Sequence, residues 1–141
     1  RFAEASNRAL HRDCSNTPGA GAAGGLGYAF MQYLGATVQS GADLLLTLTR
    51  FDDLLPNTLL IITGEGHSDR QTLMGKLPSR ILAHALPHNI PVWLLSGAIT
   101  DAPSLLAAGF SRLLPLTPPS MPLEEALKKE TARSNILRQI Q

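Results

Sequence analysis

Short apolar runs recur in the second half of the chain, at 59–62, 91–95 and 111–116. Small or polar residues follow each run, and a segment of helical composition comes next. Runs bounded in this way are typical of strands, and strands that alternate with helices predict a parallel sheet. The sequence therefore predicts an α/β fold over 59–141: a parallel sheet with covering helices, in the order βαβαβα.

The helices of this region are expected at 70–75, 78–85, 101–109 and 122–140. Asp101 with Pro103 marks the start of the third helix, and Gly109 marks its end. An apolar stripe on the last helix is formed by Leu123, Ala126, Leu127, Ile136, Leu137 and Ile140. Continuous apolar strands are usually buried on both faces. We therefore expect further strands from a part of the protein outside this sequence.

The first 58 residues have a different pattern. Residues 1–10 read as a helix without a start signal, which predicts a chain truncated at its amino end. A glycine-rich stretch at 19–27 leads to a helix at 28–34 that ends at Gly35. A short extended piece, 36–39, and a buried helix from Ser40 to Arg50 are expected next. We assign 1–58 to a second domain and 59–141 to a Rossmann-like domain.

Composition excludes several classes of protein. The chain has 141 residues, a net charge of +1 and only 5% aromatic residues, so it lacks the basic surface and stacking platform of a nucleic-acid binder. No apolar run approaches the roughly 20 residues that span a bilayer. The single cysteine, Cys14, forms no internal disulfide. We expect a cytoplasmic protein with neither a nucleic acid nor a membrane as partner.

The candidate chemistry lies where the first apolar run ends, in a polar segment at 63–72 that we expect to be a loop. Ligands of open α/β sheets collect at the carboxyl ends of the strands. Gly64 and Gly66 allow a phosphate to approach the backbone, and Glu65 and Asp69 suit a hard cation such as Mg²⁺. In the alternative interpretation the glycines only turn the chain, Asp69 caps the next helix and Lys76 is solvated.

Two nucleotide-binding signatures can be tested on the sequence. Gly75-Lys76 fails as a Walker loop, because Arg70 stands where that motif needs glycine and Leu77 stands where it needs Ser or Thr. The stretch from Gly19 to Gly24 matches the dinucleotide fingerprint, but polar residues precede it in place of a strand. Its glycines serve either close packing and a turn, or a loop that closes over substrate or phosphate.

Several motifs together resemble the bacterial ATP-dependent glycerate kinases of type I, from about Pro18 to the carboxyl end. They are the glycine-rich run 18–27, then 34–36, 40–41, 63–66, Asp69, 71–72, 75–76, Pro78 and 123–126. The resemblance implies an enzyme of two α/β domains, much longer than this chain, that phosphorylates D-glycerate, commonly at the 2-hydroxyl. This chain is then its carboxyl-terminal part.

The same resemblance implies that 64–72 and Lys76 line the active-site cleft between the domains, with the glycines at 19–27 as another wall, and the individual roles that follow are our hypothesis. Asp69, Lys76 and Glu65 are expected to be catalytic, with Asp69 and Glu65 also at the metal; Gly64, Gly66, His67, Gln71, Thr72, Gly21, Gly24 and Gly25 are expected to contact substrate or phosphate. The family usually has an arginine where His67 stands and a bulky apolar residue where Ser68 stands.

The implied ligands and partners are ATP, Mg²⁺, D-glycerate and the amino-terminal half of the same enzyme, and a homodimer is left open. Two alternatives stay open as well. One is a non-catalytic fragment that acts only in folding or association. The other is a dinucleotide-dependent oxidoreductase that binds NAD at Gly19–Gly24.

Overall fold

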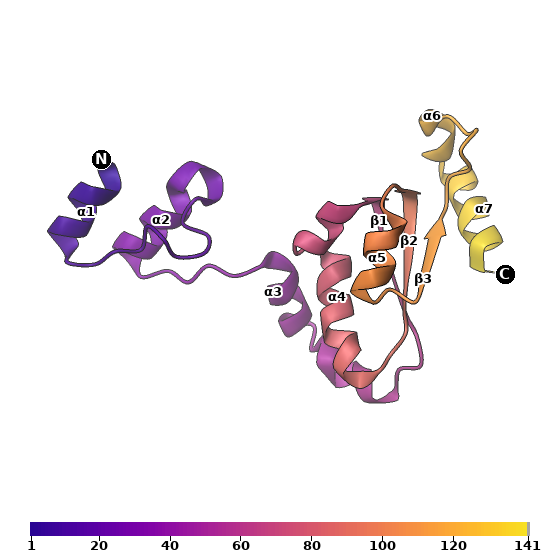
Figure 1. Ribbon diagram of the computed structural model, residues 1–141, viewed down its shortest axis with the longest axis horizontal. Coiled ribbons are helices and arrows are strands. Elements are labelled where there is room, and N and C mark those ends of the chain that lie inside the picture. The colour runs from indigo at the N-terminus through magenta and orange to yellow at the C-terminus, as the bar shows by residue number, and fades with distance from the viewer. Residues whose placement is uncertain (141) are drawn as a thin grey trace. The chain divides into compact units, whose positions relative to one another are not determined.

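The computed structural model describes residues 1–140 and divides the chain into two compact units, Arg1–Gly41 and Ala42–Gln141 (Figure 1). This boundary falls earlier in the chain than the division that we expected between residues 58 and 59. Segment 42–58 therefore packs with the sheet in this structure. The assignment of the two units to two domains of a kinase stays a prediction.

Two helices form the first unit, α1 (Phe2–Leu10) and α2 (Ala22–Leu34). Gly35 ends α2 in the left-handed conformation, as expected, but α2 starts earlier than residue 28, and 36–39 forms no strand. A small core joins the helices and the turn between them: Cys14, Ala20, Tyr28 and Met31. The Tyr28 hydroxyl donates to Asn7 Oδ1 at 2.8 Å, which fixes α2 against α1.

The second unit starts at Ala42, within α3 (Gly41–Leu48), and continues with the 3₁₀ helix η1 (Phe51–Asn57). We expected a buried helix here, and this prediction is wrong: only Leu46 of α3 is buried, while Leu45 and Leu48 are exposed. Leucine composition indicates an apolar helix, but it does not specify which neighbour covers it. In the described residues α3 is held by an ion pair, in which Asp43 Oδ2 lies 2.6 Å from Arg80 Nη2.

Three parallel strands form the predicted sheet in the order β1–β2–β3: β1 (Ile61–Ser68), β2 (Val92–Ile99) and β3 (Arg112–Pro115). The connection from β1 to β2 carries η2 (Arg70–Met74), α4 (Leu77–Ala85) and η3 (Leu86–His88), and α5 (Ala102–Ala108) connects β2 to β3. Asp101 and Gly109 cap α5 as expected. The core between helices and sheet contains Leu55, Leu82, Ala85, Ile90, Val92, Leu94, Leu105 and Phe110.

Burial alternates along β2. Val92, Leu94 and Ser96 are fully buried, whereas Trp93 and Leu95 between them are only partly buried. On the first strand Ile62 is exposed. The expectation that both faces are covered is therefore not met by residues 1–140, in which one face of the sheet packs on helices and the other is partly open.

The first strand is longer than expected. We predicted a loop from residue 63, but Gly64–Ser68 continue β1 and pair with β2 as far as His67 with Ala98 and Ser68 with Ile99. A Cβ on Gly64 would lie 2.5 Å from the carbonyl oxygen of Leu95. The glycine therefore lets two strands approach closely and does not turn the chain, which corrects that part of the alternative interpretation.

The last predicted helix is two helices, α6 (Leu123–Ala126) and α7 (Lys129–Ile140). No proline or glycine marks the break. The Glu125 carboxylate accepts hydrogen bonds there from Lys128 and Thr131, and these bonds lower its pKa. The expected apolar stripe is not buried, because only Ala126 of its members is covered, while Leu123 and Leu127 are exposed. No helix within residues 1–140 has the length and apolar character needed to cross a membrane.

Candidate active site

Glu65 is the centre of a polar network at the carboxyl end of β1. Its Oε1 accepts a hydrogen bond from Thr72 Oγ1 at 2.5 Å and another from Ser68 Oγ at 3.1 Å, and its Oε2 lies 3.4 Å from Lys76 Nζ. Thr72 and Ser68 are both fully buried. Two rigid hydroxyl donors and one lysine therefore fix the orientation of this carboxylate at the edge of the sheet.

Asp69 starts the 3₁₀ helix η2 through a reciprocal cap. Its Oδ1 accepts a hydrogen bond from the backbone N–H of Gln71 at 2.7 Å, and its own N–H donates to Thr72 Oγ1 at 3.1 Å. This confirms the capping role given by the alternative interpretation. The Asp69 side chain also accepts from the backbone N–H of Thr72, and its Oδ2 lies 3.9 Å from His67 Nε2. The Asp69 carboxylate is therefore held by the cap but stays partly exposed, beside the half-exposed imidazole of His67.

The structure places the other expected residues of this segment in different settings. His67 is half exposed, and its Nε2 lies 3.1 Å from Thr100 Oγ1, a neighbour that the sequence did not indicate. Lys76 is not simply solvated, because it pairs with Glu65. Thr72 is fully buried, and its hydroxyl donates to Glu65 Oε1 and accepts from the backbone N–H of Asp69. In this structure its side chain therefore holds Glu65 and Asp69 in place instead of facing a ligand.

A pocket of about 500 Å³ opens beside this network, which is within the usual range for small-molecule sites. Glu65, Gly66 and His67 of β1 line it together with Gly97 and Ala98 of β2. The remaining wall comes from the segment after β3 and from α6 and α7. This wall was missed by sequence reasoning, since the apolar residues of α6 and α7 read as a stripe facing a core.

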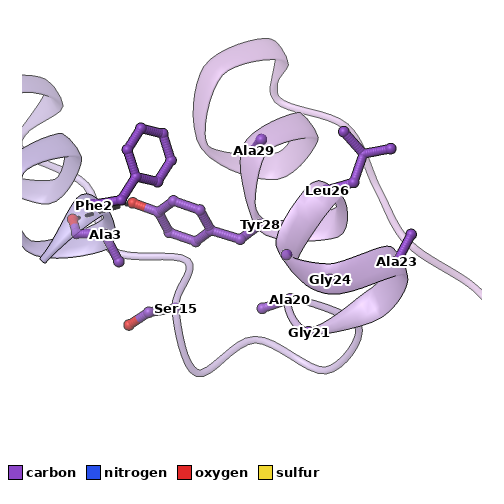
Figure 2. A pocket seen from close by; sticks show the side chains of 11 residues that line it. Phe2, Ala3, Ser15, Ala20, Gly21, Ala23, Gly24, Leu26, Tyr28 and Ala29 are labelled. Atoms are coloured by element: carbon purple, nitrogen blue, oxygen red, sulfur yellow. Dashed lines mark hydrogen bonds between the residues drawn. The ribbon is translucent and has the colours of Figure 1, made fainter.

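The glycine-rich stretch forms a separate pocket within the first unit, about 620 Å³ in volume. Gly21, Gly24 and Gly25 line it, and Figure 2 shows the rings of Phe2 and Tyr28 on another side. Ala23, Gly24 and Gly25 follow one another with left-handed φ values of 50°, 68° and 98°. Three such residues in a row aim successive peptide groups in unusual directions. This segment therefore has an irregular backbone that borders a cavity.

The donor atoms at the sheet edge can be compared with the needs of Mg²⁺. Among residues 1–140 no three or more His, Cys, Asp or Glu side chains form a metal cluster. Mg²⁺ usually takes only one or two carboxylates and completes its shell with water and phosphate oxygens. Glu65 and Asp69 supply carboxylate oxygens of that kind, and Glu65 Oε2 is paired with Lys76 Nζ in this structure.

Comparisons with known proteins give the family. The family model described as the glycerate kinase family matches residues 1–141. A glycerate kinase of Bacillus subtilis is 36% identical over 128 residues, which are 90% of this chain and 34% of that protein. The chain belongs to the glycerate kinase family. The resemblance identified from the sequence is thereby confirmed, and the oxidoreductase alternative is wrong, since its glycine fingerprint follows no strand in a chain whose first described strand is β1.

Two further relatives extend this finding. The glycerate 2-kinase of Escherichia coli is 40% identical over 100 residues, 71% of this chain and 26% of that protein. A solved structure assigned as glycerate kinase 2 of Salmonella typhimurium LT2 has a TM-score of 0.71 and 30% identity, and covers 99% of this chain and 36% of that one. The chain therefore spans about a third of the length of the glycerate kinases that it matches, with the α/β fold expected for that part.

Proposed function

We propose that this chain supplies one part of the active-site cleft of an ATP-dependent kinase that phosphorylates D-glycerate at its 2-hydroxyl. The observation that carries the proposal is the fixed Glu65 carboxylate, paired with Lys76, beside a pocket at the carboxyl end of a parallel strand. Family membership supports the reaction, and the name of the Escherichia coli relative supports the position of the phosphate. We place the protein in the cytoplasm.

Phosphoryl transfer requires alignment of the hydroxyl with the γ-phosphoryl group and neutralisation of negative charge. In our proposal Asp69 Oδ2 accepts the proton of the glycerate hydroxyl, whose oxygen forms a bond to the γ-phosphorus while the bond to the β-γ bridging oxygen breaks and ADP leaves. The cap at Oδ1 holds the carboxylate still during this step. Lys76 Nζ, positioned by Glu65, offsets the charge of the phosphate groups.

Mg²⁺ would be held by Glu65, with Asp69 beside it, and when bound it supplies charge neutralisation at the phosphate oxygens. His67 is half exposed at the rim of the pocket and is proposed to contact the anionic substrate. Gly64 and Gly66 leave the edge of β1 free of side chains, and Gln71 contributes its backbone N–H to the cap of Asp69. Gly21, Gly24 and Gly25 are proposed to form another wall for substrate or phosphate.

The test is an activity assay on the full-length enzyme that contains this chain, with D-glycerate, ATP and Mg²⁺. Product coupled directly to enolase reports 2-phosphoglycerate, whereas 3-phosphoglycerate is detected only after a mutase is added. We expect signal with enolase alone. Signal that requires the mutase would overturn the 2-hydroxyl, and absence of any ATP-dependent product would overturn the kinase.

A second assay uses the 141-residue chain alone. It separates a partial active site from a complete one, because the matched glycerate kinases are about three times as long. We expect no turnover from the chain alone. Steady product would show that the described residues suffice, and would reject both our proposal of a partial cleft and the non-catalytic alternative.

A further inference from the structure

The pocket beside Glu65 has an apolar wall that does not match the polar groups of D-glycerate. Apart from Glu65 and His67, its lining is dominated by Leu116, Met121, Leu123, Ala126, Leu127 and Ala132. D-glycerate is a small molecule with one carboxylate and two hydroxyls, and an apolar wall would leave such groups without partners. The wall therefore suits a larger ligand with an apolar face.

Two leucines of this wall are open to water in the described structure. Leu123 is 70% exposed and Leu127 is 73% exposed, although both lie next to a cavity. Burial of apolar surface by a flat ring is favourable in proportion to the area removed from water, about 25 cal/mol per Å². An aromatic heterocycle placed against Leu123 and Leu127 would cover apolar surface that residues 1–140 leave open, in a chain that spans about a third of the matched glycerate kinases.

One buried polar side chain in the same wall offers a hydrogen-bond donor to the edge of such a ring. Asn135 of α7 is only 4% exposed and lines the pocket. Its Oδ1 accepts from Arg138 Nη2 at 2.9 Å, but its Nδ2 donates to Met121 Sδ at 3.5 Å, and a thioether is a weak acceptor. A ring nitrogen would be a better partner for this buried N–H group than sulfur is.

We propose that this pocket binds the purine base of the nucleotide, with its faces against Leu123 and Leu127 and an acceptor on its edge at Asn135 Nδ2. This inference rests on the proposed function and adds the location of the base. Glu65 and His67 line the same pocket, whereas Asp69 and Lys76 do not, so a base held there lies beside the residues proposed to hold Mg²⁺ and to contact the substrate. Apolar walls with a few placed polar groups are typical of such sites.

The test narrows the pocket by one substitution. Ala132→Leu places a larger side chain in the wall, and Ala107→Leu makes the same change at an exposed position of α5 that does not line the pocket. Binding of ATP and of inorganic tripolyphosphate, which has the phosphates but no base, is measured by titration calorimetry on the full-length enzyme. We expect Ala132→Leu to weaken ATP binding about tenfold and to leave tripolyphosphate unchanged. Ala107→Leu should change neither.

Leu127→Gln is the second variant, because Leu127 is exposed in the described residues and we expect its replacement to leave this unit folded. This variant should also weaken the binding of ATP and leave the binding of tripolyphosphate unchanged. Unchanged ATP binding in both pocket variants, or an equal loss for ATP and tripolyphosphate, would overturn the inference. Phosphorylation of glycerate is measured separately. If Ala132→Leu weakens the binding of ATP but not of tripolyphosphate, while the unmodified enzyme phosphorylates no glycerate, the pocket is supported and the proposed function is rejected.

Discussion

The two glycine-bearing segments of this chain use glycine for opposite physical reasons. In β1, Gly64 has an ordinary backbone conformation, but a Cβ there would lie 2.5 Å from the Leu95 carbonyl oxygen. In α2, Gly24 and Gly25 have open space around them and left-handed backbones. The first segment therefore needs glycine for close approach of two strands, and the second needs it for backbone freedom. A sequence pattern alone does not separate the two.

The largest effect is expected for Gly64→Ala. The added Cβ meets backbone of the neighbouring strand, which cannot move aside as a flexible side chain can. We expect a loss of roughly 2–4 kcal/mol in the free energy of unfolding of the second unit. Trp93, the one tryptophan of the sequence, reports unfolding of this unit by fluorescence in a denaturant titration.

Gly66→Ala is the matched control for this prediction. A Cβ on Gly66 has nothing within 4 Å, and the residue has no left-handed φ. Its change in unfolding free energy should be within about 0.5 kcal/mol. Equal losses for Gly64→Ala and Gly66→Ala would show that strand approach is not the reason for Gly64.

An intermediate effect is expected for Gly24→Ala and Gly25→Ala in the first unit. Each forces a side chain onto a left-handed backbone, which costs about 1 kcal/mol, but neither meets a neighbouring atom. The measurement is hydrogen exchange of the α2 amides. Gly21→Ala is the control: its φ of −76° suits alanine and the space is open, so protection should not fall and should rise by at most about 1 kcal/mol. Losses above about 3 kcal/mol at Gly24 would instead indicate a steric role.

The smallest effect, and one of opposite sign, is expected for Ala23→Gly. Ala23 has a left-handed φ of 50°, and glycine would relieve that strain by about 0.5–1 kcal/mol. Ala22→Gly, one position earlier and outside the left-handed run, should destabilise α2 by a similar amount. The same exchange measurement applies. Destabilisation by Ala23→Gly would contradict the account of this segment.

The elements that follow local rules could be predicted from the sequence. Alternating apolar runs and capping residues gave the three parallel strands, α4, and α5 between Asp101 and Gly109. The extent of β1 could not be predicted in this way. Glycines, acids and a serine read as a loop, and only their pairing with Ser96–Ile99 makes them a strand. Exposure of α3, α6 and α7 also depends on which neighbours are present, which composition does not state.

The site was predicted in part. The sequence indicated Glu65, Asp69 and Lys76, and the structure brings Glu65 and Lys76 together. The sequence did not indicate Ser68, which is fully buried and donates to Glu65. It also did not indicate Asn135, a polar residue in the wall of an apolar pocket. The residue pattern placed Ser68 in an expected loop and Asn135 in an expected helix, and gave neither a role. Long-range packing decides their role, and no local signal marks it.

The central claim is that the carboxyl end of β1 carries out the chemistry, with Asp69 as the base. The most direct measurement is the turnover number of Asp69→Asn against Asp101→Asn in the full-length enzyme. Both aspartates cap a helix that follows a strand, and asparagine caps equally well, so folding is matched in the two variants. We predict turnover lower by about a hundredfold or more for Asp69→Asn and near normal for Asp101→Asn. Near-normal turnover of Asp69→Asn would contradict the account.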